Sequence, residues 1–405
     1  MSRNWNEINM VDACEILTCG VASTPKYVDE KNGIPFLSAQ NVKNGEIILD
    51  KYNYISQEYH EHLTKKNKPK KGDILYSRVG AKYGEAAVIE HDFEFSVYVS
   101  VTLIRPKPDL FDNYYFKYYL NSPRIKDLAK KSIQSSGVPN LNVNVVREFP
   151  IPIPSLLEQK QIVEILDKAF ESIEQAKANI EKNIENTKEL FQSRLNEIFS
   201  QKGEGWEEKT LKEVCTKITD GTHQTPKYFD SGYTFLSSGN VTSGIINWDK
   251  IKYIDEKQHL EMQKRVSPQL NDILLAKNGT TGVAAIVDRD IEFDIYVSLA
   301  LLRASDKLEA KYLLHFVNSP IAKKQFNKRL KGSGVPNLHL QEIREVIVPY
   351  PISKKEQLKI SNYIELLSMR TKQLEKHYKQ KLKNLEELKR SILQKAFSGE
   401  LLNDS

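Results

Sequence analysis

The chain repeats itself once, and this repeat constrains the fold more than any other feature of the sequence. The phrase Thr24-Pro25-Lys26-Tyr27 returns as Thr225-Pro226-Lys227-Tyr228, and the residues of 136–141 return at 333–338. The distance between the copies drifts from 201 residues (24 to 225) to 197 residues (136 to 333), while their order is kept. A repeat of this length predicts two copies of one structural unit that differ by small loop insertions.

The first part of each repeat has the pattern of a mixed globular domain. Runs rich in β-branched and aromatic residues at 73–77, 86–90 and 98–105 predict strands, as do 272–276 and 296–303 in the second copy. Short helices are expected at 112–120 and 309–317. We therefore expect an α+β fold with two similar globular α/β domains related by a pseudo-twofold internal repeat.

The second part of each repeat predicts a long helix. No Gly or Pro occurs at 155–202 or at 352–398, and apolar residues recur there at steps of three and four. This spacing is typical of a coiled-coil seam, and each helix could reach roughly 65–70 Å at 1.5 Å per residue. The expected seam contains Ile162, Leu166, Ala169, Ile173, Ala176, Ile180 and Ile184 in the first helix, Ile360, Ile364, Leu367, Thr371, Leu374, Tyr378 and Leu382 in the second, and the later pairs Thr187/Leu385, Leu190/Leu388 and Leu195/Leu393.

Proline and glycine mark the ends of the two helices. Prolines at 150–154 and 349–351 precede them, while Gly203, Gly205 and Gly399 follow them. The expected division is a globular domain at 1–154, a long helix at 155–202, a second globular domain at 203–351 and a second long helical segment at 352–405. The helices could pair with each other, antiparallel, or pack only on their own domains; their length and matching seams favour pairing.

Composition narrows the function classes only slightly. The 405 residues carry a formal net charge of +6, which permits an anionic partner without requiring one. The polar start of the chain and the lack of a long apolar run argue against a secretory signal and a membrane span. Three cysteines without a CxxC pair favour reduced thiols, so we expect a cytoplasmic protein with no membrane partner.

The sequence lacks the common signatures of catalysis. We find no Walker A loop, no GxGxxG after a strand, no HExxH and no GxSxG, and the histidines lack metal-ligand spacing. The Asp/Asn-Pro-Pro-aromatic tetrapeptide that an amino-methyltransferase uses to hold a flipped base is also absent. These absences favour a binding module with no catalytic or metal site.

Three polar loops in each repeat are candidates for DNA contact. Hydroxyl groups, Lys and backbone N–H groups suit phosphate, Arg suits guanine and Asn suits adenine. Ordinary turns and hairpins with incidental charge would explain the loops as well. The candidates are Thr24, Lys26 and Tyr27 in the first loop, Arg78, Lys82 and Tyr83 in the second and Ser136 and Asn140 in the third; in the second repeat they are Thr222, His223 and Lys227, then Lys277, Asn278, Thr280 and Thr281, then Ser333 and Asn337.

Four phrases of the sequence are informative as a set. They lie at 219–226 (TDGTHQTP), 71–80 (KGDILYSRVG), 152–154 leading into Glu158-Gln159, and 391–401 (SILQKAFSGEL). Together they resemble the specificity (S) subunit of type I restriction-modification enzymes. The resemblance covers essentially the whole chain. The first repeat departs from it, because it reads Thr18-Cys19-Gly20-Val21-Ala22 where the second reads Thr-Asp-Gly-Thr-His.

The resemblance implies a DNA-recognition protein without its own chemistry. The domains at 1–154 and 203–351 would be target recognition domains, each reading one half of a bipartite, asymmetric site in double-stranded DNA. The segments at 155–202 and 352–405 would be spacer helices, whose pairing would fix the distance between the halves. Two modification (methyltransferase) subunits would dock on the helices, and restriction (endonuclease/translocase) subunits would join that core. S-adenosylmethionine, ATP and Mg²⁺ would belong to those partner subunits, with no cofactor and no metal in this chain.

Other functions are compatible with the same pattern. The chain could itself carry a restriction or methylation activity, or it could be a coiled-coil scaffold that binds proteins only. It could also be an orphan specificity subunit used for swapping specificity, or a specificity module of a fused restriction-modification protein.

Overall fold

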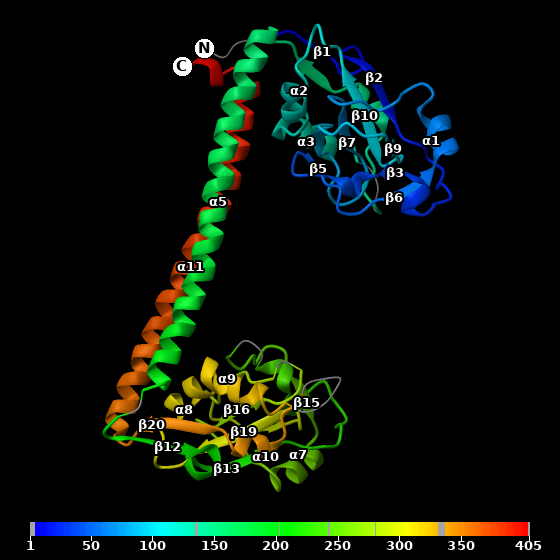
Figure 1. The fold of residues 1–405 in the computed structure, drawn as a ribbon. Helices are drawn as coiled ribbons and strands as arrows, with labels where there is room; N and C mark the ends of the chain where they lie inside the picture. The colour runs from blue at the N-terminus through cyan, green and yellow to red at the C-terminus, as the bar shows by residue number, and fades with distance from the viewer. Residues whose placement is uncertain are drawn as a thin grey trace. The chain divides into compact units, whose positions relative to one another are not determined.

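The computed structural model describes residues 5–133, 137–201, 203–241, 244–279, 281–330 and 337–403, and it divides the chain into two compact units (Figure 1). Unit 1 contains residues 1–180 and 380–405, and unit 2 contains residues 181–379. Each long helix contributes one part to each unit. The two units are described separately below.

The centre of unit 1 is an antiparallel four-stranded sheet in the order β2-β10-β7-β8. Its middle strands are almost entirely buried, as expected for β-branched and aliphatic runs covered on both faces. A second sheet, β6-β3-β9, pairs β3 with β9 in parallel, and two small sheets join β1 to β11 and β4 to β5. The strands are β1 (Glu7–Asn9), β2 (Cys14–Cys19), β3 (Gly33–Leu37), β4 (Val42–Lys43), β5 (Glu46–Ile47), β6 (Asn53–Ser56), β7 (Ile74–Ser77), β8 (Ala86–Val88), β9 (Ser96–Val97), β10 (Val101–Pro106) and β11 (Pro150–Pro152).

The helices of unit 1 begin with side chains that satisfy their free N–H groups. Asp112 accepts hydrogen bonds from the backbone N–H groups of Tyr114 and Tyr115, and Ser122 accepts one from Ile125. The helices are α1 (Gln57–Thr64), α2 (Asn113–Leu120), α3 (Pro123–Lys131) and α4 (Val143–Arg147), with short 3₁₀ turns η1 (Glu30–Asn32), η2 (Ala39–Asn41) and η4 (Leu401–Asn403).

Unit 2 repeats this arrangement. Its four-stranded sheet has the order β13-β19-β16-β17, its three-stranded sheet has the order β15-β14-β18, and β12 pairs with β20. The strands are β12 (Trp206–Thr210), β13 (Cys215–Asp220), β14 (Tyr233–Leu236), β15 (Lys252–Ile254), β16 (Ile273–Ala276), β17 (Ala284–Ile286), β18 (Phe293–Ile295), β19 (Leu299–Ala304) and β20 (Ile347–Pro351). The helices are α6 (Leu211–Val214), α7 (Glu256–Gln263), α8 (Ala310–Val317), α9 (Pro320–Asn327) and α10 (Leu340–Arg344), with the 3₁₀ turn η3 (Ser238–Asn240).

The two long helices expected from the repeat are α5 (Leu156–Phe199) and α11 (Lys354–Phe397). In unit 1 they pair antiparallel, because Glu174 bonds Lys389 at 2.9 Å and Lys177 bonds Glu386 at 2.6 Å. As residue numbers rise along α5, those of the partners fall along α11. The expectation of antiparallel pairing is confirmed in this unit.

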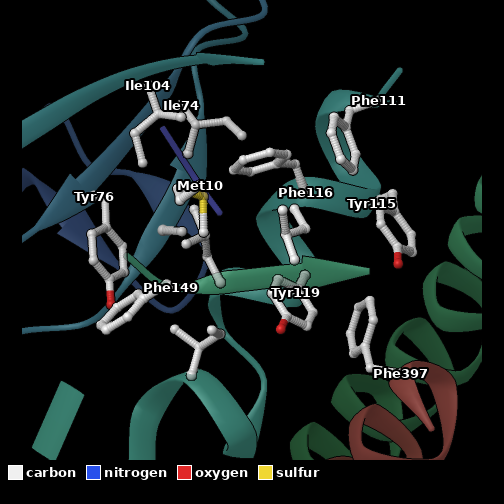
Figure 2. Packing of buried hydrophobic residues seen from close by; sticks show 14 of the residues in the cluster. Met10, Ile74, Tyr76, Ile104, Phe111, Tyr115, Phe116, Tyr119, Phe149 and Phe397 are labelled. Carbon is white, nitrogen blue, oxygen red and sulfur yellow. The ribbon is translucent and has the colours of Figure 1, made fainter. Parts of the chain in front are cut away.

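Aromatic contacts join the helix pair to the globular part of each unit. In unit 1, the ring of Phe397 lies 5.4 Å from Tyr115 and 5.1 Å from Tyr119 (Figure 2). In unit 2, Phe199 lies 5.5 Å from both Tyr312 and Phe316. Each long helix therefore packs its last aromatic residue into the core that receives the other helix at its start.

The seam expected from the sequence is partly wrong. Ile162 and Leu166 are fully buried and Ile364 almost so, but Leu190, Leu374 and Leu388 are exposed. Near Leu190 the buried stripe moves by one residue, and the neighbouring Phe191 packs against the core of unit 2 instead. The failures are local, because Leu195 and Leu393, the last pair of the expected seam, are buried.

Candidate functional site

The second and third polar loops of unit 1 meet at the end of the four-stranded sheet. The backbone N–H of Gly80 donates to Pro139 at 3.0 Å and that of Leu141 donates to Arg78 at 2.9 Å, while Val79 pairs with Asn140 in an isolated β-bridge. These backbone contacts place residues about 60 positions apart in the chain side by side. The loops therefore form one continuous surface element.

The first loop of unit 1 joins the same cluster through the segment after β9. The N–H of Val99 donates to the carbonyl of Val21 at 2.9 Å, and the N–H of Arg78 donates to Ser100 at 2.8 Å. Segments from all three candidate loops thus converge, and we call them the three-loop cluster of unit 1 (residues 20–27, 77–84 and 137–141).

The side chain of Arg78 is buried and stabilises this cluster by hydrogen bonds to backbone carbonyls. It is 6% exposed, and its guanidinium donates to the carbonyl oxygens of Leu141 at 2.6 Å and of Val99 at 2.7 Å. Burial lowers the pKa of Arg78 from its usual value. Since its donors are directed to backbone carbonyls inside the fold, Arg78 has a structural role and does not face a ligand.

Unit 2 contains the corresponding three-loop cluster (residues 220–228, 277–279, 281–282 and 337–338). The N–H of Leu338 donates to Lys277 at 3.0 Å, Asn278 bridges Asn337, and the N–H of Val297 donates to Thr222 at 2.9 Å. The backbone frame is the same as in unit 1, although most polar side chains differ. A shared frame with different side chains can present different chemistry in the two units.

A buried ion pair takes the place of the Arg78 contacts in unit 2. Lys277, which aligns with Arg78, is 6% exposed, and its Nζ lies 2.6 Å from Oδ2 of Asp220, which is 2% exposed. Burial alone would raise the pKa of Asp220, but hydrogen bonds from Lys277 and Arg265 outweigh it and hold that pKa below its usual value. Asp220 is therefore charged at neutral pH, and Lys277, like Arg78, is held inside the fold.

A glycine brings the first loop close to the parallel strand pair in both units. A Cβ atom on Gly20 would lie 2.0 Å from the carbonyl oxygen of Val97, and one on Gly221 would lie 1.8 Å from that of Ile295. Any side chain there would push the loop away from β9 or β18. The position of the first loop therefore requires glycine directly after β2 and directly after β13.

The remaining candidate residues differ in accessibility. Thr24, Lys26 and Tyr27 are exposed in unit 1, as are Lys82 and Asn140, whereas Tyr83 is half-buried and packs against the core. In unit 2, His223 and Lys227 are exposed, and Thr222, Asn278, Thr281 and Asn337 are half-buried. Ser136, Thr280 and Ser333 lie outside the described residues.

A hollow of about 210 Å³ adjoins the first loop of unit 2. It is lined by Tyr228, Ser237, Asn240, Lys250 and Lys252 among others, and Nζ of Lys252 lies 4.0 Å from the centre of the Tyr228 ring. An aromatic face with two ammonium groups suits an anionic or planar group. In unit 1, Tyr27 occupies the position of Tyr228, while Asn53 replaces Lys252.

Two residues of this site were not singled out as contacts from the sequence. Arg265, just after α7, donates from Nη2 to Oδ1 of Asp220 at 2.6 Å and contacts Nε2 of His223 at 3.2 Å. Asp220 belongs to the quoted phrase at 219–226, but nothing there indicates that it is the buried counter-ion of two cations. Arg265 lies 45 residues further along the chain, so no local pattern connects the two.

Metal and membrane sites do not appear in the described part of the chain. No group of three or more His, Cys, Asp or Glu residues among the described positions is arranged to hold a metal ion. Among those same residues, no helix is both long and apolar enough to cross a bilayer.

The chain is similar to proteins that belong to restriction-modification systems. A family model described as the type I restriction modification DNA specificity domain matches residues 2–186 and again residues 203–384. The type I restriction enzyme MjaVIII specificity subunit of Methanocaldococcus jannaschii is 26% identical over 380 residues, which cover 87% of this chain and 84% of that protein. The EcoKI specificity subunit of Escherichia coli K12 is 24% identical over 391 residues, which cover 91% and 82%.

Solved structures show the same fold. A chain of a type I R-M system, solved to describe complex assembly and conformational transition, superposes with a TM-score of 0.76 at 19% identity over 98% of both chains. The HsdS subunit of Thermoanaerobacter tengcongensis superposes with a TM-score of 0.61 at 18% identity, covering 98% of this chain and 97% of that one. The fold class expected from the sequence repeat is confirmed by these neighbours.

Proposed function

Because the chain belongs to the family of type I restriction modification DNA specificity domains, we propose that it selects the DNA sequence on which a type I restriction-modification complex acts. In this proposal it binds double-stranded DNA at a bipartite, asymmetric site. Unit 1 reads one half through its three-loop cluster, and unit 2 reads the other half.

The observation that carries the proposal is the repeated three-loop cluster. In both units, backbone hydrogen bonds hold the same three loops together, so the frame does not depend on the surface side chains. On that frame, Thr24, Lys26 and Lys82 are exposed in unit 1, and His223 and Lys227 are exposed in unit 2. Lys and hydroxyl groups fix register on phosphates, while side chains that differ between the units read different bases.

We propose that α5 and α11 carry the partner subunits. Exposed large apolar side chains recur along α11 at Leu358, Tyr363, Leu366 and Met369, and Leu157 of α5 is 69% exposed. A row of exposed apolar side chains on one helix, unlike a single one, favours a protein partner. Two modification subunits would dock on these helices, with restriction subunits added to that core, and the helix pair would set the spacing between the half-sites.

In the same proposal this chain performs no chemistry. The curated relatives are named specificity subunits of restriction enzymes, and S-adenosylmethionine, ATP and Mg²⁺ would be bound by the partner subunits. We expect the complex to act on cytoplasmic DNA. An orphan specificity subunit that exchanges with others would read DNA in the same way but would have no methyltransferase encoded beside it.

Methylome sequencing of the host with and without the gene tests the proposal. We expect the loss of one split, adenine-methylated motif when the gene is removed and its return on complementation. An unchanged methylome in a host that encodes the partner subunits would contradict the proposal. Methylated or cleaved DNA produced by the purified chain alone, supplied with S-adenosylmethionine and Mg²⁺, would show that the chain is itself an enzyme.

A further inference from the structure

The Asp220 cluster of unit 2 carries more positive charge than its buried carboxylate can balance. Nζ of Lys277 lies 2.6 Å from one carboxylate oxygen of Asp220, and Nη2 of Arg265 lies 2.6 Å from the other. With one carboxylate against two basic side chains, the cluster has a formal charge of +1. The excess lies at the surface, because the side chain of Arg265 is 48% exposed whereas that of Lys277 is 7% exposed.

Asp220 holds Arg265 in one orientation. The Nε of Arg265 donates to the backbone carbonyl of Asp220 at 3.2 Å and Nη2 donates to its carboxylate, so two donors of the fork are fixed. Within the described residues, Nη1 of Arg265 makes no contact. A fork held on one edge presents its remaining N–H groups in a set direction, which lowers the entropy lost when they bind an acceptor.

His223 lies beside this free edge. Its Nε2 is 3.2 Å from Nη2 of Arg265, which only donates, and 3.3 Å from Oδ1 of Asp220, so this side of the ring faces the cluster. The opposite nitrogen, Nδ1, has no hydrogen-bond partner in the described part of the chain, and the side chain is 61% exposed. In the tautomer in which Nε2 accepts from Arg265, Nδ1 donates outward, and we call Arg265 and His223 in this arrangement the donor edge.

Unit 1 lacks this edge at the equivalent positions. Cys19 replaces Asp220, Ala22 replaces His223, and Lys66 stands in place of Arg265. Without a carboxylate, the buried cation of unit 1, Arg78, is held by backbone carbonyls, and nothing there orients an exposed arginine. The donor edge is therefore a property of unit 2 alone.

We propose that Arg265 and His223, positioned by Asp220, bind a pair of hydrogen-bond acceptors on the half-site that unit 2 reads. Two groups on DNA offer such acceptors: the N7 and O6 atoms of guanine in the major groove, and the non-bridging oxygens of a phosphate. A guanine contact makes the pair a specificity determinant, whereas a phosphate contact makes it an anchor of register. This inference rests on the proposed function.

The test uses the full chain assembled with its methyltransferase subunits and duplexes that carry the split motif found in the methylome. Arg265→Ala, Arg265→Lys and His223→Ala are compared with Lys264→Ala, which removes the same charge from an exposed neighbour. We expect Arg265→Ala to weaken binding by roughly 10- to 100-fold. Lys264→Ala should cost about two- to threefold, as loss of a surface charge alone would.

Two further measurements distinguish guanine from phosphate. If the acceptor is guanine, replacing one guanine of a single half-site by 7-deazaguanine weakens the wild type but not Arg265→Ala, and the variant methylates sites with other bases at that position. If it is phosphate, Arg265→Ala weakens all sequences equally and lowers the salt dependence by about one charge. Arg265→Lys restores binding substantially only in the phosphate case, because a lysine lacks the fork.

The outcomes separate this inference from the function on which it rests. A wild-type complex with no sequence preference would overturn both. A wild-type complex that prefers one motif, with Arg265→Ala and His223→Ala binding it as well as Lys264→Ala does, would overturn only the donor edge. Because both side chains are exposed, equal melting temperatures of the variants and the wild type check that folding is intact.

Discussion

A buried glutamine at the start of each long helix offers a sharp test of how the helices are attached to their units. Gln159 is fully buried; its Oε1 accepts from the N–H of Asp112 at 2.8 Å, and its Nε2 donates to the carbonyls of Leu110 at 2.8 Å and Pro154 at 2.9 Å. In unit 2, Gln357 makes the same three bonds to Glu309, Lys307 and Pro351. The surrounding backbone requires one hydrogen-bond acceptor and two N–H donors at this position, and the carboxamide of glutamine supplies all three.

The substitution Gln159→Glu changes one atom of this arrangement. The new oxygen faces two carbonyl oxygens at the distances where Nε2 now donates, so the side chain must either ionise beside them or protonate and satisfy only one. An unsatisfied buried polar group costs about 1–3 kcal/mol, and a charged one costs more. We therefore expect Gln159→Glu to lower the free energy of unfolding of unit 1 by about 3–5 kcal/mol at neutral pH.

Hydrogen exchange measured by mass spectrometry locates the effect. Amides of 107–112 and of the first turn of α5 should exchange faster in Gln159→Glu, while Gln357→Glu should produce the same change in unit 2. The exposed neighbour Gln161 supplies the matched control, since Gln161→Glu introduces the same chemistry on the same helix. Part of the loss should be recovered toward pH 4–5, where a protonated carboxyl donates once. A loss below about 1 kcal/mol, or one equal to that of Gln161→Glu, would refute the reasoning.

Three other predictions concern separate parts of the fold. Burial lowers the pKa of His315 from 6.5 to about 4, so the unfolded chain binds a proton at a higher pH than the folded chain does. The free energy of unfolding should therefore decrease as the pH falls from 6.5 to 4, by about 1–2 kcal/mol at pH 5. The variant His315→Phe should flatten the profile of thermal unfolding against pH. Gly221→Ala should lower the melting temperature of unit 2 and weaken DNA binding, because its Cβ would lie 1.8 Å from a carbonyl oxygen. The control Gly239→Ala should be tolerated, because the nearest atom to its Cβ lies at 3.8 Å. Equal effects of the two variants would argue against the close approach at Gly221. Inserting four residues near Asn183 and four at the repeat-equivalent point of α11 adds roughly 6 Å to each helix. Selection of binding sites from random DNA should then favour a spacer about two base pairs longer. An unchanged spacer would contradict the proposal that the helices set the distance between the half-sites.

The sequence was most informative where a signal is periodic and extends over many residues. The absence of Gly and Pro over more than 40 residues, with apolar residues every three or four, predicted α5 and α11 to within a few residues of their ends. Strands β7, β8, β10, β16 and β19 were predicted because buried strands are runs of apolar residues, whereas β2, β13 and β17 of the same sheets were not predicted. The seam failed locally, at Leu374, Leu190 and Leu388, and the same apolar spacing gave no sign of these exposed positions.

The sequence could not separate structural cations from accessible ones. Arg78 and Lys277 were candidates for base contact because both follow a strand in a glycine-containing loop, yet both side chains are buried and bonded within the fold. Whether a cation at the end of a strand points into the fold or out of it depends on residues distant in the chain, such as Leu141 or Asp220. A single sequence carries no sign of those contacts.

The comparison of the two units indicates how such a frame can diverge without losing its fold. In both, a buried cation under the second loop must be satisfied, because an unpaired charge there would be strongly destabilising. Unit 1 satisfies Arg78 with backbone carbonyls, which adds no charge, whereas unit 2 satisfies Lys277 with Asp220, whose second oxygen remains available to bind Arg265. The choice between Cys19 and Asp220 at one position of the frame therefore decides whether a carboxylate is present to hold the basic side chain at the position of Arg265, which is Lys66 in unit 1. Changes beneath the loops can alter what the surface presents while the backbone contacts that join the loops stay the same.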